Sequence, residues 1–177
     1  MQLTKEGKRI IAYVYHGLAP KDAGYEYYMI KDKSAAASVA AESPVKVLRK
    51  DASAHIVEKD GIVCAALFDA NMDFEGMIVQ SVNIPLAYIL EDKGEGQYVL
   101  SLCEPDMRRP WKLNMNDLEN EDVAAQAKPF ETKLVLGGTF EVISSDGDVE
   151  AVQENGKTKL TLTTVNARNY TLQLRKQ

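Results

Sequence analysis

The stretch Ala54-His55-Ile56-Val57-Glu58-Lys59-Asp60-Gly61-Ile62-Val63-Cys64-Ala65-Ala66-Leu67-Phe68 contains two apolar, β-branched segments separated by Asp-Gly. Residues of these types favour strands. Asp-Gly between two such segments favours a tight hairpin turn, because glycine accepts a positive φ. Residues 62–68 are apolar throughout, which is typical of a strand covered on both faces. The stretch therefore predicts an antiparallel hairpin inside a β-rich domain.

Similar segments recur on both sides of this hairpin. Strand-like runs occupy residues 9–15, 25–30, 45–49, 77–82, 86–90, 97–103, 133–136, 139–143, 149–153, 159–163 and 170–174. Hairpin turns are expected at Gly137-Gly138, Asp146-Gly147 and Asn155-Gly156. Alternation predicts an inward face that carries Leu160, Leu162, Leu172 and Leu174. Pro85 predicts an edge or a break. About a dozen short strands predict a β-sandwich.

The expected fold class is all-β. Residues 1–106 are predicted to form the terminal part of a large antiparallel β-sandwich, and residues 129–177 a smaller C-terminal β-sandwich. Residues 107–128 lack a core pattern and predict a linker. One short helix is expected at 34–42, where alanines follow the N-cap residue Ser34 and Pro44 ends the segment.

The composition is that of a globular domain. Hydrophobic residues make up 45%, charged residues 27%, and the net charge is -5. This charge gives no attraction to nucleic acid or to an anionic membrane, and an acidic polysaccharide would need a local basic patch. No apolar run reaches the roughly 18 residues of a membrane-spanning helix. Residues 1–8 lack the apolar core of a signal peptide.

The two cysteines, Cys64 and Cys103, both lie in apolar, strand-like runs. Two buried free thiols are the favoured interpretation, and one disulfide between them is the alternative. Two cysteines cannot form a disulfide framework, and their spacing is not that of a zinc site. A redox function is disfavoured because there is no Cys-x-x-Cys motif.

The best binding candidate is the group Arg108, Arg109 and Trp111, which Lys112 follows. A guanidinium could contact a sulfate or carboxylate, and the indole could stack on a sugar ring. The alternative is a linker in which Trp111 fills a gap in the core. Exposure separates the two, because a sugar platform needs an exposed Trp111.

Few other residues indicate chemistry. His16 lies at a strand end and is a candidate ligand or catalytic residue, although a loop histidine that orders the turn is the favoured interpretation. His55 lies within a strand and is a candidate base, although a half-buried histidine bonded to a neighbour is the favoured interpretation. Glu91, Asp92, Asp146 and Asp148 flank turns. Calcium at Asp146 and Asp148 is the one metal alternative, and solvated turn residues are the favoured interpretation. No cofactor is expected, because there is no phosphate-binding glycine loop and no zinc-protease motif.

Residues 16–27 carry a more specific pattern. His16-Gly17, Pro20, Tyr25 and Tyr27 resemble a junction in the β-sandwich of bacterial glycosaminoglycan lyases. These are the chondroitin, hyaluronate and xanthan lyases of polysaccharide lyase family 8. The motif residues His16, Gly17, Pro20, Tyr25 and Tyr27 look structural in that family.

Three further segments support the resemblance. Residues 44–57, with Val47-Leu48-Arg49-Lys50-Asp51 and His55-Ile56, are similar to a strand-turn-strand of the broad-specificity chondroitin sulfate ABC lyases. His55, like the motif residues above, looks structural in that family. Residues 65–68 fit the next strand, and residues 101–106 resemble the segment that closes the large sandwich. The resemblance follows the chain in order, with the hairpins after Lys128 resembling a small terminal sandwich.

The resemblance implies an enzyme that cleaves the bond to a uronic acid by β-elimination. It also implies an acidic polysaccharide substrate, chondroitin sulfate or hyaluronate, and a secreted or periplasmic bacterial location. The family's catalytic residues lie in a helical domain and early in the sandwich, and no motif in this sequence matches them. We therefore expect no catalytic residue here, and a scaffolding role beside a catalytic domain outside this chain.

Two other functions stay open. The chain could be a stand-alone carbohydrate-binding module, which would use Arg108, Arg109 and Trp111, or a structural sandwich for protein contacts. If the chain is one region of a larger sandwich, an apolar patch should remain where the other strands pack.

Overall fold

The structure is a computed structural model that describes residues 2–6, 9–13, 45–70, 72–105, 129–165 and 167–177. The chain forms two compact units, Met1–Ser43 and Pro44–Gln177. In the first unit, β1 (Gln2–Glu6) pairs antiparallel with β2 (Arg9–Tyr13). The strand expected at 25–30 and the helix expected at 34–42 lie outside the described residues.

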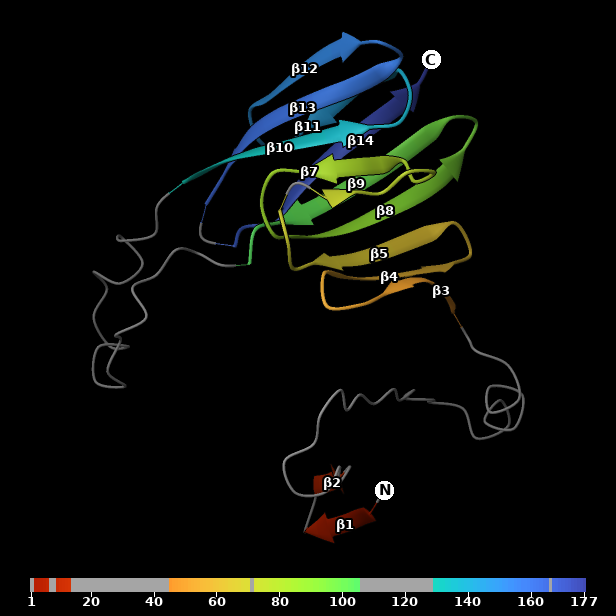
Figure 1. Ribbon diagram of the computed structural model, residues 1–177, viewed down its shortest axis with the longest axis vertical. Coiled ribbons are helices and arrows are strands. Elements are labelled where there is room, and N and C mark those ends of the chain that lie inside the picture. Colours follow the sequence, from red (N-terminus) through yellow and green to blue (C-terminus); the bar gives the residue numbers. More distant parts are fainter. Residues whose placement is uncertain (1, 7–8, 14–44, 71, 106–128, 166) are drawn as a thin grey trace. The chain divides into compact units, whose positions relative to one another are not determined.

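The second unit is a sandwich of two antiparallel sheets (Figure 1). The larger has seven strands in the order β11-β14-β9-β8-β5-β4-β3, and the smaller has five in the order β12-β13-β10-β7-β6. The strands of the larger sheet are β3 (Lys46–Lys50), β4 (Ala54–Lys59), β5 (Ile62–Leu67), β8 (Leu86–Gly94), β9 (Gln97–Cys103), β11 (Phe140–Ser145) and β14 (Tyr170–Lys176). Those of the smaller sheet are β6 (Met72–Asp73), β7 (Val79–Val82), β10 (Phe130–Leu136), β12 (Val149–Glu154) and β13 (Lys157–Thr164). The all-β sandwich expected from the sequence is confirmed.

Two of the predicted tight hairpins are present. Asp60-Gly61 turns β4 into β5, with φ of 52° and 78°. Asn155-Gly156 turns β12 into β13, with φ of 53° and 73°. Two successive positive φ angles match the right-handed twist of the strands that they join. These turns could be predicted because their chemistry is local.

The hairpin predicted at Gly137-Gly138 is wrong. β10 belongs to the smaller sheet and β11 to the larger, so the chain crosses between sheets at these glycines. Both edges of β10 are already paired, with β7 and β13. The Thr158 hydroxyl fixes the crossing, because it accepts the Phe140 N–H at 2.7 Å and donates to the Gly138 carbonyl at 2.9 Å.

The hairpin predicted at Asp146-Gly147 is also wrong, because β11 and β12 lie in different sheets. Gly147 is not among the glycines with a positive φ. A Cβ at this position would lie 2.8 Å from Cδ1 of Tyr170. The close approach of a buried ring, and not a turn conformation, requires glycine here. Pro85 lies between β7 and β8, which are in different sheets, so the predicted break is correct.

The last strands do not form a sandwich of their own. β10 pairs with β7, and β14 pairs with β9, so residues 129–177 complete the sheets that residues 45–103 begin. The expected linker, 107–128, lies outside the described residues. Hairpin signals are local and do not reveal which strand will occupy the other edge of a sheet, which is why the sequence favoured two sandwiches.

The core lies between the two sheets. Leu160, Leu162, Leu172 and Leu174 are buried as predicted, and Phe140 and Leu100 are fully buried beside them. Full burial of each such side chain contributes about 1.5 to 3 kcal/mol. The buried hydroxyls of Thr132 and Thr164 are 2.8 Å apart and satisfy each other. This core fixes which side of each strand faces outward.

Candidate docking face

The outer side of the seven-stranded sheet carries an apolar row across four strands. Val47 of β3 pairs with Val57 of β4, Val57 pairs with Cys64 of β5, and Cys64 pairs with Ile89 of β8. Residues opposite each other on neighbouring strands point to the same side, so these four side chains lie together. The inward side is taken by residues such as Ile56, which is fully buried.

This side is uncovered by the described residues. Four of the six exposed large hydrophobic residues are Val47, Ile62, Phe68 and Ile89, with exposed fractions of 44%, 37%, 48% and 49%. Ile62 and Phe68 belong to the same outward alternation of β5 as Cys64 and Ala66. We call the surface formed by Val47, Val57, Ile62, Cys64, Ala66, Phe68, Ala87 and Ile89 the apolar face. An exposed apolar patch of this kind marks an interaction surface.

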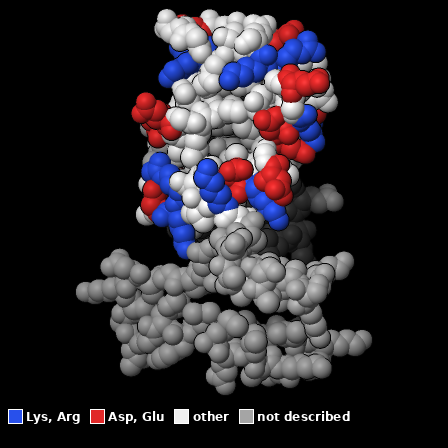
Figure 2. Space-filling model, turned by 90° about the vertical axis from the view of Figure 1, so that its right-hand side faces the viewer, with Lys and Arg blue, Asp and Glu red and all other residues white. Residues whose placement is uncertain are grey.

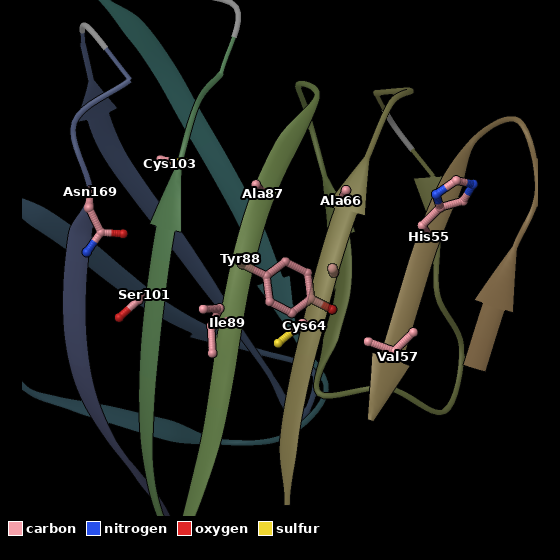
Figure 3. Close-up of a pocket in the computed structure, with 11 residues that line it drawn as sticks. His55, Val57, Cys64, Ala66, Ala87, Tyr88, Ile89, Ser101, Cys103 and Asn169 are labelled. Atoms are coloured by element: carbon pink, nitrogen blue, oxygen red, sulfur yellow. The ribbon is translucent and has the colours of Figure 1, made fainter. Parts of the chain in front are cut away.

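The centre of the apolar face is hollowed (Figure 3). Ala66 pairs with Ala87, and their short side chains leave a depression between the larger residues on either side. The open hollow is about 410 Å³. The residues that line it are His55, Val57, Cys64, Ala65, Ala66, Ala87, Tyr88, Ile89, Ser101, Cys103 and Asn169. Most of them are apolar, so the hollow suits apolar side chains of a partner surface.

His55 lies at the rim of this hollow. Its ring meets Phe68 edge to face, with 5.1 Å between centroids and 85° between planes. The side chain is exposed, where the sequence predicted a half-buried histidine. Through this ring contact, His55 extends the rim of the apolar face.

The prediction that residues 62–68 are covered on both faces is not met by the described residues. Ala65 and Leu67 are buried, whereas Ile62, Cys64 and Phe68 are exposed. The strand has apolar residues on both sides. Among the described residues, the core of the sandwich covers the inward side, and nothing covers the outward side. The outward side of this strand is therefore an exposed apolar surface within the part of the chain that the structure describes.

The cysteines lie on the same outward side. Both are free, and Cys64 is exposed whereas Cys103 is half-buried, so the prediction of two buried thiols is only partly correct. β8 separates their strands, which places them at least about 9.5 Å apart, beyond the roughly 7 Å Cα separation that a disulfide allows. Burial raises the pKa of the Cys103 thiol, and the neighbouring Glu104 carboxylate raises it further.

The other candidate residues from the sequence lie elsewhere. His16, Gly17, Pro20, Tyr25 and Tyr27, together with Arg108, Arg109 and Trp111, are outside the described residues. The exposure of Trp111, which separates a sugar platform from a core plug, therefore stays a prediction.

Three of the four turn carboxylates make contacts within their own turns or to a neighbouring strand. Asp146 accepts the Thr171 N–H at 2.9 Å, which ties the β11–β12 connection to β14. Asp92 accepts the Gly94 N–H at 2.8 Å, and Glu91 forms an ion pair with Lys93. Within the described ranges, no group of three or more His, Cys, Asp or Glu side chains could hold a metal ion.

Tyr88 is buried in the core, and desolvation raises the pKa of its phenol to about 12. A phenol with this pKa stays protonated at neutral pH and is a poor general base.

Charged side chains of both signs are interspersed on the surface drawn in Figure 2. The part of the chain that the structure describes contains no helix with the length and apolar character that a bilayer crossing requires.

Comparison with solved structures gives the fold a precedent. The structure of chondroitin AC lyase from Streptomyces coelicolor A3, in a mutant form, matches 82% of this chain with a TM-score of 0.59 and 15% sequence identity. The same enzyme in complex with chondroitin sulphate matches with a TM-score of 0.58 and the same identity. This chain covers 17% of the length of either chain. No protein-family model and no curated protein matches the sequence.

Proposed function

We propose that this chain is the non-catalytic β-sandwich region of a bacterial glycosaminoglycan lyase, in which it supports the catalytic domain. The observation that carries this proposal is the apolar face. A module that exposes Val47, Ile62, Phe68 and Ile89 on one sheet needs a cover in its working form. The cover that we propose is another part of the same lyase.

Two findings support the choice of a lyase. The sandwich has the fold of a part of chondroitin AC lyase, and the match occupies 17% of that chain. In the neighbour, therefore, most of the polypeptide lies outside the matched region. The motifs of residues 16–27 and 44–57 resemble family 8 lyases independently of the fold, with the closest resemblance to the chondroitin sulfate ABC lyases.

The chemistry of β-elimination supports a non-catalytic role. The reaction needs a base with a pKa near the working pH, and cations that neutralise the uronate carboxylate. Among the described residues, His55 lies on the apolar face and Tyr88 has a pKa of about 12. The hollow that both side chains line contains no lysine or arginine that could neutralise a uronate. We therefore place catalysis outside this chain, and by the same resemblance we propose a secreted or periplasmic location.

An elimination assay tests this proposal. The purified chain is incubated with chondroitin sulfate and, separately, with hyaluronate, and the absorbance of the unsaturated uronate is followed. The expected result is no product above the buffer control. Product formation that survives repurification would contradict the proposal, and its loss in His55→Ala would locate the active site on the apolar face.

A further inference from the structure

The outer side of the five-stranded sheet has a second hollow of different character. Its volume is about 500 Å³. The residues that line it are Asp73, Gln80, Ser81, Val82, Asn83, Lys133, Val135, Lys157 and Lys159. Three lysines and one carboxylate give the lining a local positive excess in a chain whose net charge is -5. We call this hollow the lysine groove.

Strand register explains why the lysines gather. Val135 pairs with Ser81 on one side and with Lys159 on the other. Lys133 precedes Val135 by two residues on β10, and Lys157 precedes Lys159 by two residues on β13. Because the strands are antiparallel, Lys133 and Lys157 lie on opposite sides of Val135. With about 3.4 Å per residue, the backbone positions span roughly 14 Å along the strands. The three lysines therefore stand at spaced positions along the strands.

Two of the lysines are held by exposed carboxylates outside the lining. Lys133 lies 2.5 Å from Glu131, and Lys159 forms an ion pair with Glu154. Exposed ion pairs of this kind are weak and exchange readily with solvent ions. Among the described residues, Lys157 has no ion-pair partner within 4.0 Å. An anion in the groove could therefore recruit all three ammonium groups.

The Asn83 side chain links two strands at the wall of the groove. The Asn83 amide donates to the Glu131 carbonyl at 2.8 Å, and its oxygen accepts the Lys133 N–H at 2.6 Å. This side chain joins the end of β7 to β10 and fixes the base of Lys133. Because the strands hold the backbone positions of the three lysines apart before binding, the ligand does not have to order this part of the backbone. The entropy cost of binding is therefore smaller.

We propose that the lysine groove binds a chain of acidic polysaccharide that carries sulfate and carboxylate groups. This choice of ligand rests on the proposed lyase function, whereas the anion preference rests on the lysines themselves. Cations spaced along the strands suit a linear polyanion better than a single small anion. The groove and the apolar face lie on the outward sides of different sheets, so docking and polysaccharide binding can occur together.

A binding assay with matched variants tests the groove. The probe is a fluorescently labelled chondroitin sulfate oligosaccharide, titrated at low salt and followed by anisotropy. The groove variant is Lys133→Ala/Lys157→Ala/Lys159→Ala. The control variant is Lys46→Ala/Lys59→Ala/Lys93→Ala, which removes three exposed lysines from the other sheet, two of them ion-paired with Glu58 and Glu91. Both variants change the net charge equally.

The groove variant is expected to bind about tenfold more weakly, with a shallower dependence on salt, whereas the control stays within about twofold. Hyaluronate, which lacks sulfate, is expected to bind more weakly than chondroitin sulfate. Equal weakening in both variants would overturn the groove, because only net charge would matter. Equal affinity for single-stranded DNA of the same charge would overturn the polysaccharide assignment.

Failure of the unsubstituted chain to bind chondroitin sulfate at low salt would also overturn the groove. The scaffold proposal would survive that result, because the elimination assay tests it separately. Conversely, elimination by the chain would refute the scaffold proposal and leave the groove measurement intact. Thermal unfolding is measured for all variants, and each is expected to unfold at nearly the same temperature as the unsubstituted chain, because the substituted lysines are exposed.

Discussion

Cys64 and Ile89 stand opposite each other on β5 and β8, and both side chains are exposed on the outer side of the seven-stranded sheet. This pairing places a reactive reporter group at the centre of an apolar surface. The chemistry of the thiol therefore reports whether the surface is covered.

In the isolated chain, Cys64 is expected to react with iodoacetamide several-fold faster than Cys103. Cys64 is exposed, whereas Cys103 is half-buried and has a raised pKa. The thiolate is the reactive form, and burial reduces both its population and its access. A time course by peptide mass spectrometry measures the two rates. Faster modification of Cys103 would show that the apolar face is already covered within the chain.

Substitution of Ile89 by lysine is expected to reduce the binding of a hydrophobic dye without unfolding the protein. Ile89 is 49% exposed, so the change in the free energy of unfolding should stay within about 0.5 kcal/mol. The matched control is Val152→Lys, because Val152 is 47% exposed on the other sheet. Dye fluorescence and thermal unfolding are measured for both. If Val152→Lys lowers the fluorescence as much as Ile89→Lys does, the dye does not report the apolar face.

Substitution of Gly147 by alanine is expected to destabilise the sandwich by about 1 to 3 kcal/mol. The new Cβ would lie 2.8 Å from the Tyr170 ring, which is buried and stacked against Arg168 at 5.1 Å. The comparison is Gly137→Ala, where the closest atoms belong to the end of the Gln80 side chain, which can move. Urea unfolding of both variants gives the two energies. A larger loss for Gly137→Ala would contradict this account.

Stability is expected to fall between about pH 10 and pH 12 because of Tyr88. Its folded pKa of about 12 lies above the ordinary value of 10.0, so the folded state holds the phenol protonated. The contribution is complete below the unfolded pKa and is lost as the pH rises towards the folded pKa. A shift of this size corresponds to about 2 to 3 kcal/mol. Tyr88→Phe should flatten this part of the pH profile in urea unfolding, and an unchanged slope would refute the assignment.

Turn conformations that depend on adjacent residues could be predicted from the sequence. The pairing between strands that are distant in sequence could not. Asp60-Gly61 and Asn155-Gly156 turn as expected because their conformations depend on adjacent residues alone. Gly137-Gly138 looked the same but crosses between sheets, because β10 is paired on both sides by strands distant in sequence. Gly147 serves the packing of Tyr170, a contact across 23 positions that no local pattern encodes.

The candidate surfaces were only partly visible in the sequence. Residues 62–68 are apolar on both sides, which indicated double coverage but could not show that one cover is absent from the described chain. The lysine groove depends on the register of three strands, so Lys133, Lys157 and Lys159 look unrelated in sequence. Their alternation with buried residues such as Leu134 and Leu160 was the available signal.

The most direct test of the central claim is the reactivity of Cys64 in two forms of the protein. The rate of Cys64 modification in the isolated chain is compared with that in the native protein purified from its source organism, with Cys103 as the internal reference. The scaffold account predicts that Cys64 is exposed in the isolated chain and protected by at least about tenfold in the native protein, because another part of the lyase covers the apolar face. Equal rates in the two forms would contradict it.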